Sequence, residues 1–154
     1  MSDLKAGDAA PDFTLPTDRG QVSLKDLKGK PVVLYFYPKD DTTGCTLEAR
    51  DFTARLKDFE KAGAVVIGVS KDSVKSHGKF RAKYDLAHEL ASDETGEMIE
   101  RYGVWVEKSM YGRKYMGIER ATFLIGPDGR IRHVWRKVKT SGHAEDVLKL
   151  LRAG

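Results

Sequence analysis

The feature that most constrains this chain is an apolar run that ends in a turn and leads into the segment carrying the only cysteine. Residues 32–37 are all β-branched, aromatic or leucine, a composition typical of a buried strand. Pro38 ends the run, and residues 40–44 form a cluster of turn-forming side chains. From Cys45 onward, apolar residues recur at helical spacing until Gly63, which is a natural stop. The sequence therefore predicts one helix with a lone thiol in its first turn, at the end of a buried strand.

A thiol in the first turn of a helix lies where an anion is favoured. The N–H groups of that turn have no acceptor within the helix, and the aligned peptide dipoles place partial positive charge there. Both effects favour the thiolate, which is the form of cysteine that reacts with peroxides. The competing interpretation is a buried structural cysteine, because free cysteine is among the most buried residue types. The local context of Cys45 favours the reactive interpretation.

The spacing Pro38-x-x-x-Thr42-x-x-Cys45, followed by Glu48, resembles the active-site motif of the peroxiredoxins. The segments that flank the motif are similar to the bacterioferritin-comigratory, or Q-type (PrxQ), subgroup, and the likeness runs through almost the whole chain. The resemblance implies an α/β, thioredoxin-like fold. Such a fold has a mixed central sheet with helices on both faces, here with an N-terminal β extension. Periodicity alone supports only an α/β chain of one domain.

The resemblance also implies a role for each residue of the motif. Cys45 would be the peroxidatic nucleophile, Thr42 would orient the peroxide, and Pro38 would shield the sulfur from water. An arginine from a later strand completes such a pocket, and Arg120 fits that place. Without the resemblance, a surface arginine in a salt bridge is the favoured interpretation of Arg120.

Two further residues are expected to bind the substrate or support its binding. The N–H groups of Gly44 and Cys45 can hold the peroxide oxygens and stabilise negative charge that develops on them. Glu48 lies about one helical turn after Cys45 and is expected to orient an arginine rather than to act as a base. An ordinary solvated helix carboxylate is the alternative interpretation of Glu48.

The expected activity follows from the single cysteine, which excludes an intramolecular disulfide. Many Q-type relatives carry a second, resolving cysteine, either five residues after the first or on the next helix. Arg50 occupies the first of these positions here, and an approximate alignment places Arg81 near the second. We therefore expect a thiol-dependent peroxidase of the one-cysteine type. It would reduce hydrogen peroxide and organic hydroperoxides through a sulfenic acid on Cys45.

The expected partner is an external thiol reductant, either thioredoxin or glutaredoxin with glutathione, and no cofactor is expected. A peroxide-sensing redox interaction protein with little turnover is the main alternative, because the chain has no resolving cysteine. A nucleic-acid-binding domain is a third reading, suggested by the basic residues 130–139. On a strand these charges alternate between both faces, so a solvated hairpin is favoured and no nucleic acid is expected.

Composition sets the broad class of the protein. The 154 residues are 32% charged and 40% hydrophobic, which is typical of one soluble globular domain, spanning 1–154. No apolar run approaches the roughly 18 residues that span a membrane, and residues 1–8 contain no hydrophobic signal segment. We therefore expect a cytoplasmic protein that does not contact membranes. The net charge of +4 is mild, and a monomer or weak homodimer is the default expectation.

The four histidines are not expected to form a metal site. They are scattered along the chain and lack metal-ligand spacing with Cys45. Surface or partly packed side chains are therefore expected for all of them, which are His77, His88, His133 and His143.

The remaining elements follow from apolar periodicity and turn residues. A second buried strand is expected at residues 64–70, parallel to the first. Residues 103–117 are expected to be a loop, in which Trp105, Tyr111 and Tyr115 either line the pocket, form a partner surface or simply pack. The other expected elements are a strand pair around residues 17–20, helices at 24–27, 73–84, 97–102 and 142–151, a weak strand at 89–92, and a hairpin of 121–125 with 130–138.

Overall fold

Strand β3 (Val32–Phe36) lies inside the central sheet, as its apolar sequence predicts. All five of its residues are buried. It pairs in parallel with β4 (Val65–Ser70) and antiparallel with β8 (Ala121–Ile125), so it is covered by strands on both edges. The structure is a computed structural model that describes residues 4–154. Residues 1–3, which begin the segment expected to contain no signal peptide, lie outside the described residues.

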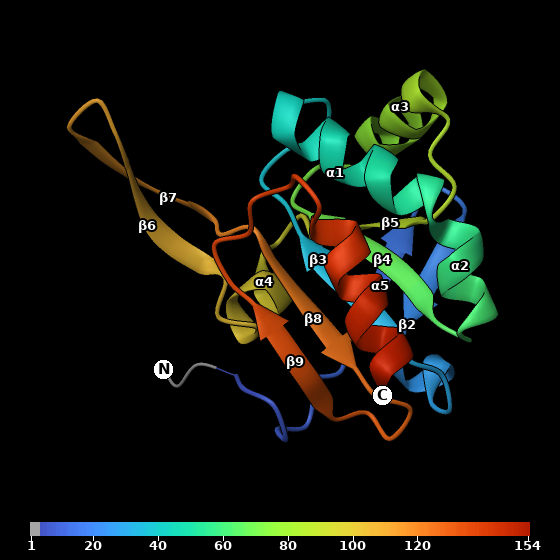
Figure 1. Ribbon diagram of the computed structural model, residues 1–154. Coiled ribbons are helices and arrows are strands. Elements are labelled where there is room, and N and C mark those ends of the chain that lie inside the picture. The colour runs from blue at the N-terminus through green and yellow to red at the C-terminus, as the bar shows by residue number, and fades with distance from the viewer. Residues whose placement is uncertain (1–3) are drawn as a thin grey trace.

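The sheet has seven strands in the order β2-β1-β5-β4-β3-β8-β9 and mixes parallel with antiparallel pairs (Figure 1). The N-terminal hairpin of β1 and β2 joins the sheet through an antiparallel bridge to β5, which confirms the predicted N-terminal β extension. The strands not yet given are β1 (Thr14–Thr17), β2 (Gly20–Ser23), β5 (Glu89–Ser92) and β9 (Ile131–Trp135).

Helices cover both faces of this sheet, so the predicted fold class is confirmed. On one face, side chains of the helices after β3 and β4 and of the C-terminal helix pack together, including Phe52, Phe59, Phe80 and Val147. On the other face a short helix contributes Ile99 to a second core. The helices are η1 (Leu24–Leu27), α1 (Thr43–Ala54), α2 (Leu56–Lys61), α3 (Val74–Tyr84), α4 (Glu97–Arg101) and α5 (His143–Ala153).

The helix that follows Cys45 is divided in two, whereas one continuous helix was expected. The break falls at Arg55, whose backbone angles are φ −104° and ψ 7°. Its N–H is shared between the carbonyls of Asp51 and Phe52, at 3.3 and 3.2 Å, a tightening typical of a helix end. Phe52 and Phe59 are both fully buried on either side of the break, so the apolar face continues across it.

Residues 105–118 form a hairpin, so the prediction of a loop there is wrong. Strands β6 (Trp105–Met110) and β7 (Arg113–Ile118) pair antiparallel and make a separate sheet that extends away from the body (Figure 1). The connecting residues Tyr111 and Gly112 have φ values of 52° and 78°. Two successive positive φ values define the two-residue turn whose twist matches a hairpin. The Tyr-Gly pair is the signal that could have identified it.

The three aromatic residues of this segment have different surroundings. Tyr111 lies at the hairpin tip and is 97% exposed, so it neither packs nor lines the cysteine site. Tyr115 is also exposed. Trp105 is partly buried against the core, with the ammonium of Lys71 4.6 Å from its ring centre.

Ser73 caps α3, since its hydroxyl accepts a hydrogen bond from the N–H of Ser76. Ser23 precedes η1 without a capping hydrogen bond from its side chain, and its hydroxyl accepts a hydrogen bond from that of Thr14. Within residues 4–154, no helix combines the length and the apolar character needed to cross a bilayer.

Candidate functional site

Cys45 lies in the first turn of α1, just beyond the carboxyl end of β3, and is 1% exposed. The first helical hydrogen bond runs from the N–H of Thr46 to the carbonyl of Thr42, at 2.8 Å. The N–H groups of Gly44 and Cys45 precede it and have no acceptor within the helix. Thr42 is the N-cap residue, but its side chain accepts no hydrogen bond from them; its hydroxyl donates to the carbonyl of Lys39 at 2.9 Å. These N–H groups therefore form a donor site for an anion next to the sulfur.

Arg120 brings the predicted cation to the cysteine. It precedes β8, and pairing of Phe36 with Ala121 places it beside the end of β3. Its Nη2 lies 3.3 Å from the Sγ of Cys45. A Cβ atom at Gly44 would lie 3.2 Å from the same Nη2, so glycine at this position leaves room for the guanidinium.

Glu48 holds the other end of that guanidinium. Its Oε1 lies 2.7 Å from the Nη1 of Arg120, in the orienting geometry that the sequence predicts. Glu48 is 1% exposed, so the alternative of a solvated helix carboxylate is wrong. Burial raises the pKa of Glu48 to about 7, against the opposing influence of Arg120. Its second oxygen, Oε2, has no hydrogen-bond partner among residues 4–154.

Lys108 adds a second cation that the sequence did not reveal, because its segment was expected to be a loop. It lies opposite Tyr115 in the β6–β7 ladder. Its side chain runs along Gly117 toward the base of the hairpin, where a Cβ on that glycine would lie 3.3 Å from its Cδ. Burial and the charge of Arg120 lower the pKa of Lys108, while Cys45 raises it. Lys108 therefore lies within electrostatic range of both Arg120 and Cys45.

Pro38 and Thr42 both lie on the loop between β3 and α1, and both are exposed. The structure thus brings Arg120 into direct contact with both Cys45 and Glu48, and it places Pro38 and Thr42 on the adjoining loop. The shielding and orienting roles of those two residues stay predictions.

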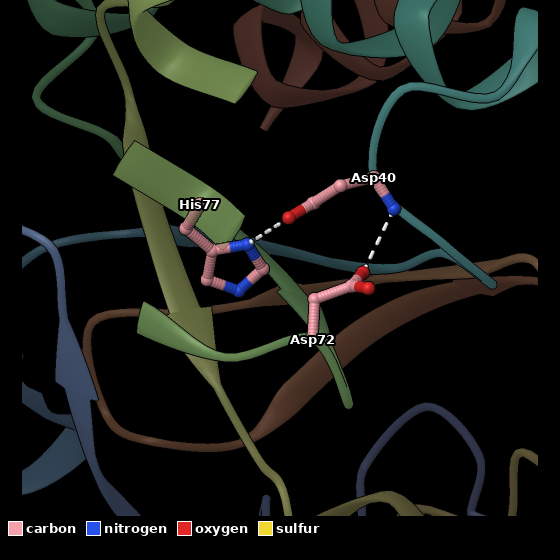
Figure 2. A group of neighbouring side chains, drawn as sticks. All are labelled: Asp40, Asp72 and His77. Atoms are coloured by element: carbon pink, nitrogen blue, oxygen red, sulfur yellow. Dashed lines mark hydrogen bonds and ion pairs between the residues drawn. The ribbon is translucent and has the colours of Figure 1, made fainter. Parts of the chain in front are cut away.

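The loop is anchored by a buried cluster of Asp40, Asp72 and His77, shown in Figure 2. Asp40 lies in the loop itself, Asp72 follows β4, and His77 lies on α3. The Nδ1 of His77 is 2.7 Å from the Oδ2 of Asp40, and the N–H of Asp40 donates to Asp72 at 2.8 Å.

The expectation of surface or partly packed histidines is therefore wrong for three of the four. His77, His88 and His143 are buried, whereas His133 is exposed. Their partners differ: His77 faces a carboxylate, while His88 and His143 face hydroxyl groups. Burial lowers the pKa of His88 to about 3 and that of His143 to about 4. The hydroxyl-bonded pair is therefore neutral at pH 7.

Comparison with known proteins gives a consistent picture. A family model described as the AhpC/TSA family matches residues 6–134. The peroxiredoxin Bcp of Bacillus subtilis is 47% identical over 150 residues, covering 97% of this chain and 96% of that protein. Peroxiredoxin Q of Xanthomonas campestris has a TM-score of 0.89 at 48% identity, with 97% and 96% of the two chains covered. A serine variant of Xylella fastidiosa PrxQ has a TM-score of 0.93 at 42% identity, with 99% and 98% covered.

The Xanthomonas structures also bear on the missing second cysteine. They include serine variants of two different cysteines that lie 36 positions apart. The same separation leads from Cys45 to Arg81 in this chain. By this spacing, an arginine of α3 occupies the place of the second cysteine.

Proposed function

This chain belongs to the AhpC/TSA family, among its Bcp or Q-type peroxiredoxins, and we propose that it reduces peroxides through Cys45 with an external thiol as reductant. The observation that carries the proposal is the contact of 3.3 Å between the Arg120 guanidinium and a buried sulfur in the first turn of α1. A guanidinium and free first-turn N–H groups at one sulfur are donors that suit an oxygen gaining charge beside it.

In the proposed first step, the thiolate of Cys45 attacks one peroxide oxygen. An S–O bond forms as the O–O bond breaks, and the electron pair of the O–O bond leaves with the distal oxygen. That oxygen takes a proton and departs as water or an alcohol, while Cys45 becomes a sulfenic acid. The N–H groups of Gly44 and Cys45, the Thr42 hydroxyl and Arg120 would hold the two oxygens. Pro38 would limit access of water, and Glu48 would fix the orientation of Arg120.

In the proposed second step, a thiol from outside the chain reduces the sulfenic acid. The first thiol forms a mixed disulfide with Cys45 and releases water, and a second thiol displaces Cys45 as a free thiol. This route suits a chain in which Arg50 and Arg81 occupy the two positions where relatives carry a resolving cysteine. Thioredoxin, or glutaredoxin with glutathione, is the proposed source of the thiol. Organic hydroperoxides are proposed as substrates beside hydrogen peroxide, since a structure of the Xanthomonas campestris bacterioferritin comigratory protein concerns its alkyl peroxide reduction activity.

Rapid mixing with a small excess of hydrogen peroxide, followed by intact mass measurement, tests the first step. We expect Cys45 to gain one oxygen orders of magnitude faster than free cysteine does, because donors fixed around the sulfur stabilise the charge that develops on the leaving oxygen. Cys45→Ser should abolish peroxide turnover. Oxidation of the wild type no faster than that of free cysteine, or turnover retained in Cys45→Ser, would contradict the proposal.

A peroxide sensor with little turnover is the second candidate, favoured by the absence of a second cysteine in the 154 residues. The rate at which oxidised Cys45 is reduced by thiols distinguishes a peroxidase from a sensor. A peroxidase is reduced rapidly by thioredoxin, or by glutaredoxin with glutathione. A sensor is oxidised equally fast but is reduced slowly by both.

A further inference from the structure

Asp40 is the most heavily bonded residue of the loop between β3 and α1. Its carboxylate accepts from the hydroxyl of Tyr37 at 2.6 Å, the hydroxyl of Ser76 at 2.8 Å and the Nδ1 of His77 at 2.7 Å. Its backbone N–H donates to Asp72 at 2.8 Å. Three separate parts of the chain therefore fix one loop residue.

His77 has an acceptor at each ring nitrogen. Its Nε2 lies 3.0 Å from the carbonyl oxygen of Ala91, which can only accept a hydrogen bond. Its Nδ1 faces the carboxylate of Asp40 (Figure 2). Both nitrogens must therefore carry hydrogen, and a histidine protonated on both nitrogens is a cation.

The charged and titratable groups around His77 agree with this assignment. Asp40 faces it from the loop after β3, Asp72 from the turn after β4, and Tyr37 from the end of β3, with its hydroxyl 3.4 Å from Nδ1. Burial alone lowers the pKa of His77, but the hydrogen bond and charge of Asp40 outweigh it, so the pKa is raised. Tyr37 stays neutral, because burial and Asp40 raise its pKa far above 10.

A metal ion could in principle join these residues, since one ligand atom each from Asp40, Asp72 and His77 lie within 4.8 Å of one another. The donors are already engaged, however. The Oδ2 of Asp72 accepts from the hydroxyl of Ser70 and the N–H of Asp40, and both nitrogens of His77 are bonded. The cluster is therefore better described as a buried ion pair than as a metal centre.

The position of Asp40 connects this ion pair to the cysteine site. Asp40 comes two residues after Pro38 and two before Thr42, the N-cap of α1. The next residue, Asp41, has a φ of 59°, a left-handed conformation that aspartate adopts more readily than most residues other than glycine. The loop therefore turns sharply between Asp40 and Thr42.

We propose that His77 is a positioning residue of the peroxide reaction: as an imidazolium it holds Asp40, and through Asp40 the loop that places Thr42 and the first turn of α1 against the peroxide. This role rests on the proposed function of Cys45. His77 does not touch the sulfur; it acts through the geometry of the loop, where small displacements reduce rates strongly.

Nitrogen-15 NMR of the reduced wild-type protein at pH 7 tests the charge state without any substitution. The expected result is two protonated ring nitrogens for His77, and neutral rings for His88 and His143. A neutral tautomer at His77 would overturn the proposal.

His77→Gln tests the positioning role, with His133→Gln as control, because His133 is an exposed histidine on β9. We expect Cys45 of the His77→Gln protein to be oxidised roughly 10- to 100-fold more slowly, and the control to match the wild type. Circular dichroism checks that each variant is folded.

The pH profile separates positioning from a general loss of structure. A raised pKa means that the imidazolium is present at low and neutral pH and is lost as pH rises through that pKa. The wild-type oxidation rate should therefore fall on the alkaline side in step with the His77 NMR titration, whereas the slower His77→Gln protein should lack this decline. Equal rates in the two proteins, or the same alkaline decline in both, would refute the role of His77. A wild type that reacts no faster than free cysteine would instead refute the proposed function itself.

Discussion

At Arg120, one side chain serves two partners. Its Nη2 contacts the sulfur of Cys45, and its Nη1 contacts the carboxylate of Glu48. The lack of a side chain at Gly44 leaves room for the guanidinium beside the helix. A planar fork of donors can satisfy both contacts at once, whereas the single ammonium of a lysine cannot. The requirement at this position is therefore for arginine geometry as well as for positive charge.

We expect Arg120→Lys to keep part of the rate of Cys45 oxidation and Arg120→Met to lose roughly 10²- to 10³-fold, the usual loss when a donor to a developing charge is removed. Stopped-flow measurement with hydrogen peroxide provides the comparison. Arg113→Met on the exposed part of β7 removes the same charge at a distance from the sulfur and should leave the rate unchanged. If Arg113→Met slowed Cys45 oxidation as much as Arg120→Met did, the slowing would be due to the change in net charge and not to the contact with the sulfur.

Among the elements, α3 is held by contacts that its sequence did not suggest. Arg81 makes a two-pronged contact with Asp18 in the turn between β1 and β2, with Nε–Oδ2 at 2.5 Å and Nη2–Oδ1 at 3.0 Å. Its Nη1 also donates to the carbonyl of Leu86 beyond the end of the helix. Arg81 follows Cys45 by the same 36 positions that separate the two substituted cysteines of the Xanthomonas campestris protein, and in this chain the arginine fastens α3 to the N-terminal hairpin.

Removing this contact should destabilise the fold. We expect Arg81→Ala to lower the free energy of unfolding by about 2–4 kcal/mol, because Asp18 would be left largely buried without its partner. Urea unfolding measures the change. Arg50→Ala, on the exposed side of α1, should alter the stability by less than about 0.5 kcal/mol. Equal stabilities for the two variants would show that the ion pair contributes nothing.

Elements with a strong local pattern were predictable, and those that depend on contacts were not. The apolar run at residues 32–37 and the turn after it correctly predicted a strand leading into the cysteine helix. The hairpin of residues 105–118 was missed because its strands extend from the core and carry few buried residues, so alternation is weak. The helix break at Arg55 was not predicted because it consists of one backbone N–H shared between two carbonyls, and the apolar spacing of the sequence continues across it.

The same division applies to the site. The motif around Cys45 predicted the residues of its own segment, and the resemblance supplied Arg120. Lys108 and the buried His77 were not predicted, because each gains its position from elements that are distant in sequence.

Across the whole molecule, buried ionisable groups act on stability in opposite directions. His88 and His143 are neutral in the folded state and have lowered pKa values, so the stability they contribute is present above pH 6.5 and is lost as the pH falls. Glu48 has a raised pKa and works the other way, favouring the folded state as the pH falls below about 7. The overall pH dependence is therefore a balance, and single variants are needed to separate its parts.

His88→Gln isolates one part of that balance. Between pH 7 and pH 5 the wild type should lose about 2 kcal/mol that the variant does not lose, because His88 must stay uncharged in the fold while it takes up a proton in the unfolded chain. Urea unfolding of both proteins at pH 7, 6 and 5 gives the difference. His133→Gln should follow the wild type at every pH, and a constant gap between wild type and His88→Gln would contradict the prediction.

The single buried cysteine also limits how the molecule handles oxidising equivalents. A chain that reacts as proposed takes two of them onto one sulfur atom and has no second thiol to which it can pass them. No reaction within the chain can then reduce the oxidised cysteine, so the lifetime of the oxidised state depends on how often an outside thiol reaches it. The ratio of oxidised to reduced protein at steady state is consequently set by the ratio of two rates, that of oxidation by peroxide and that of reduction by thiol.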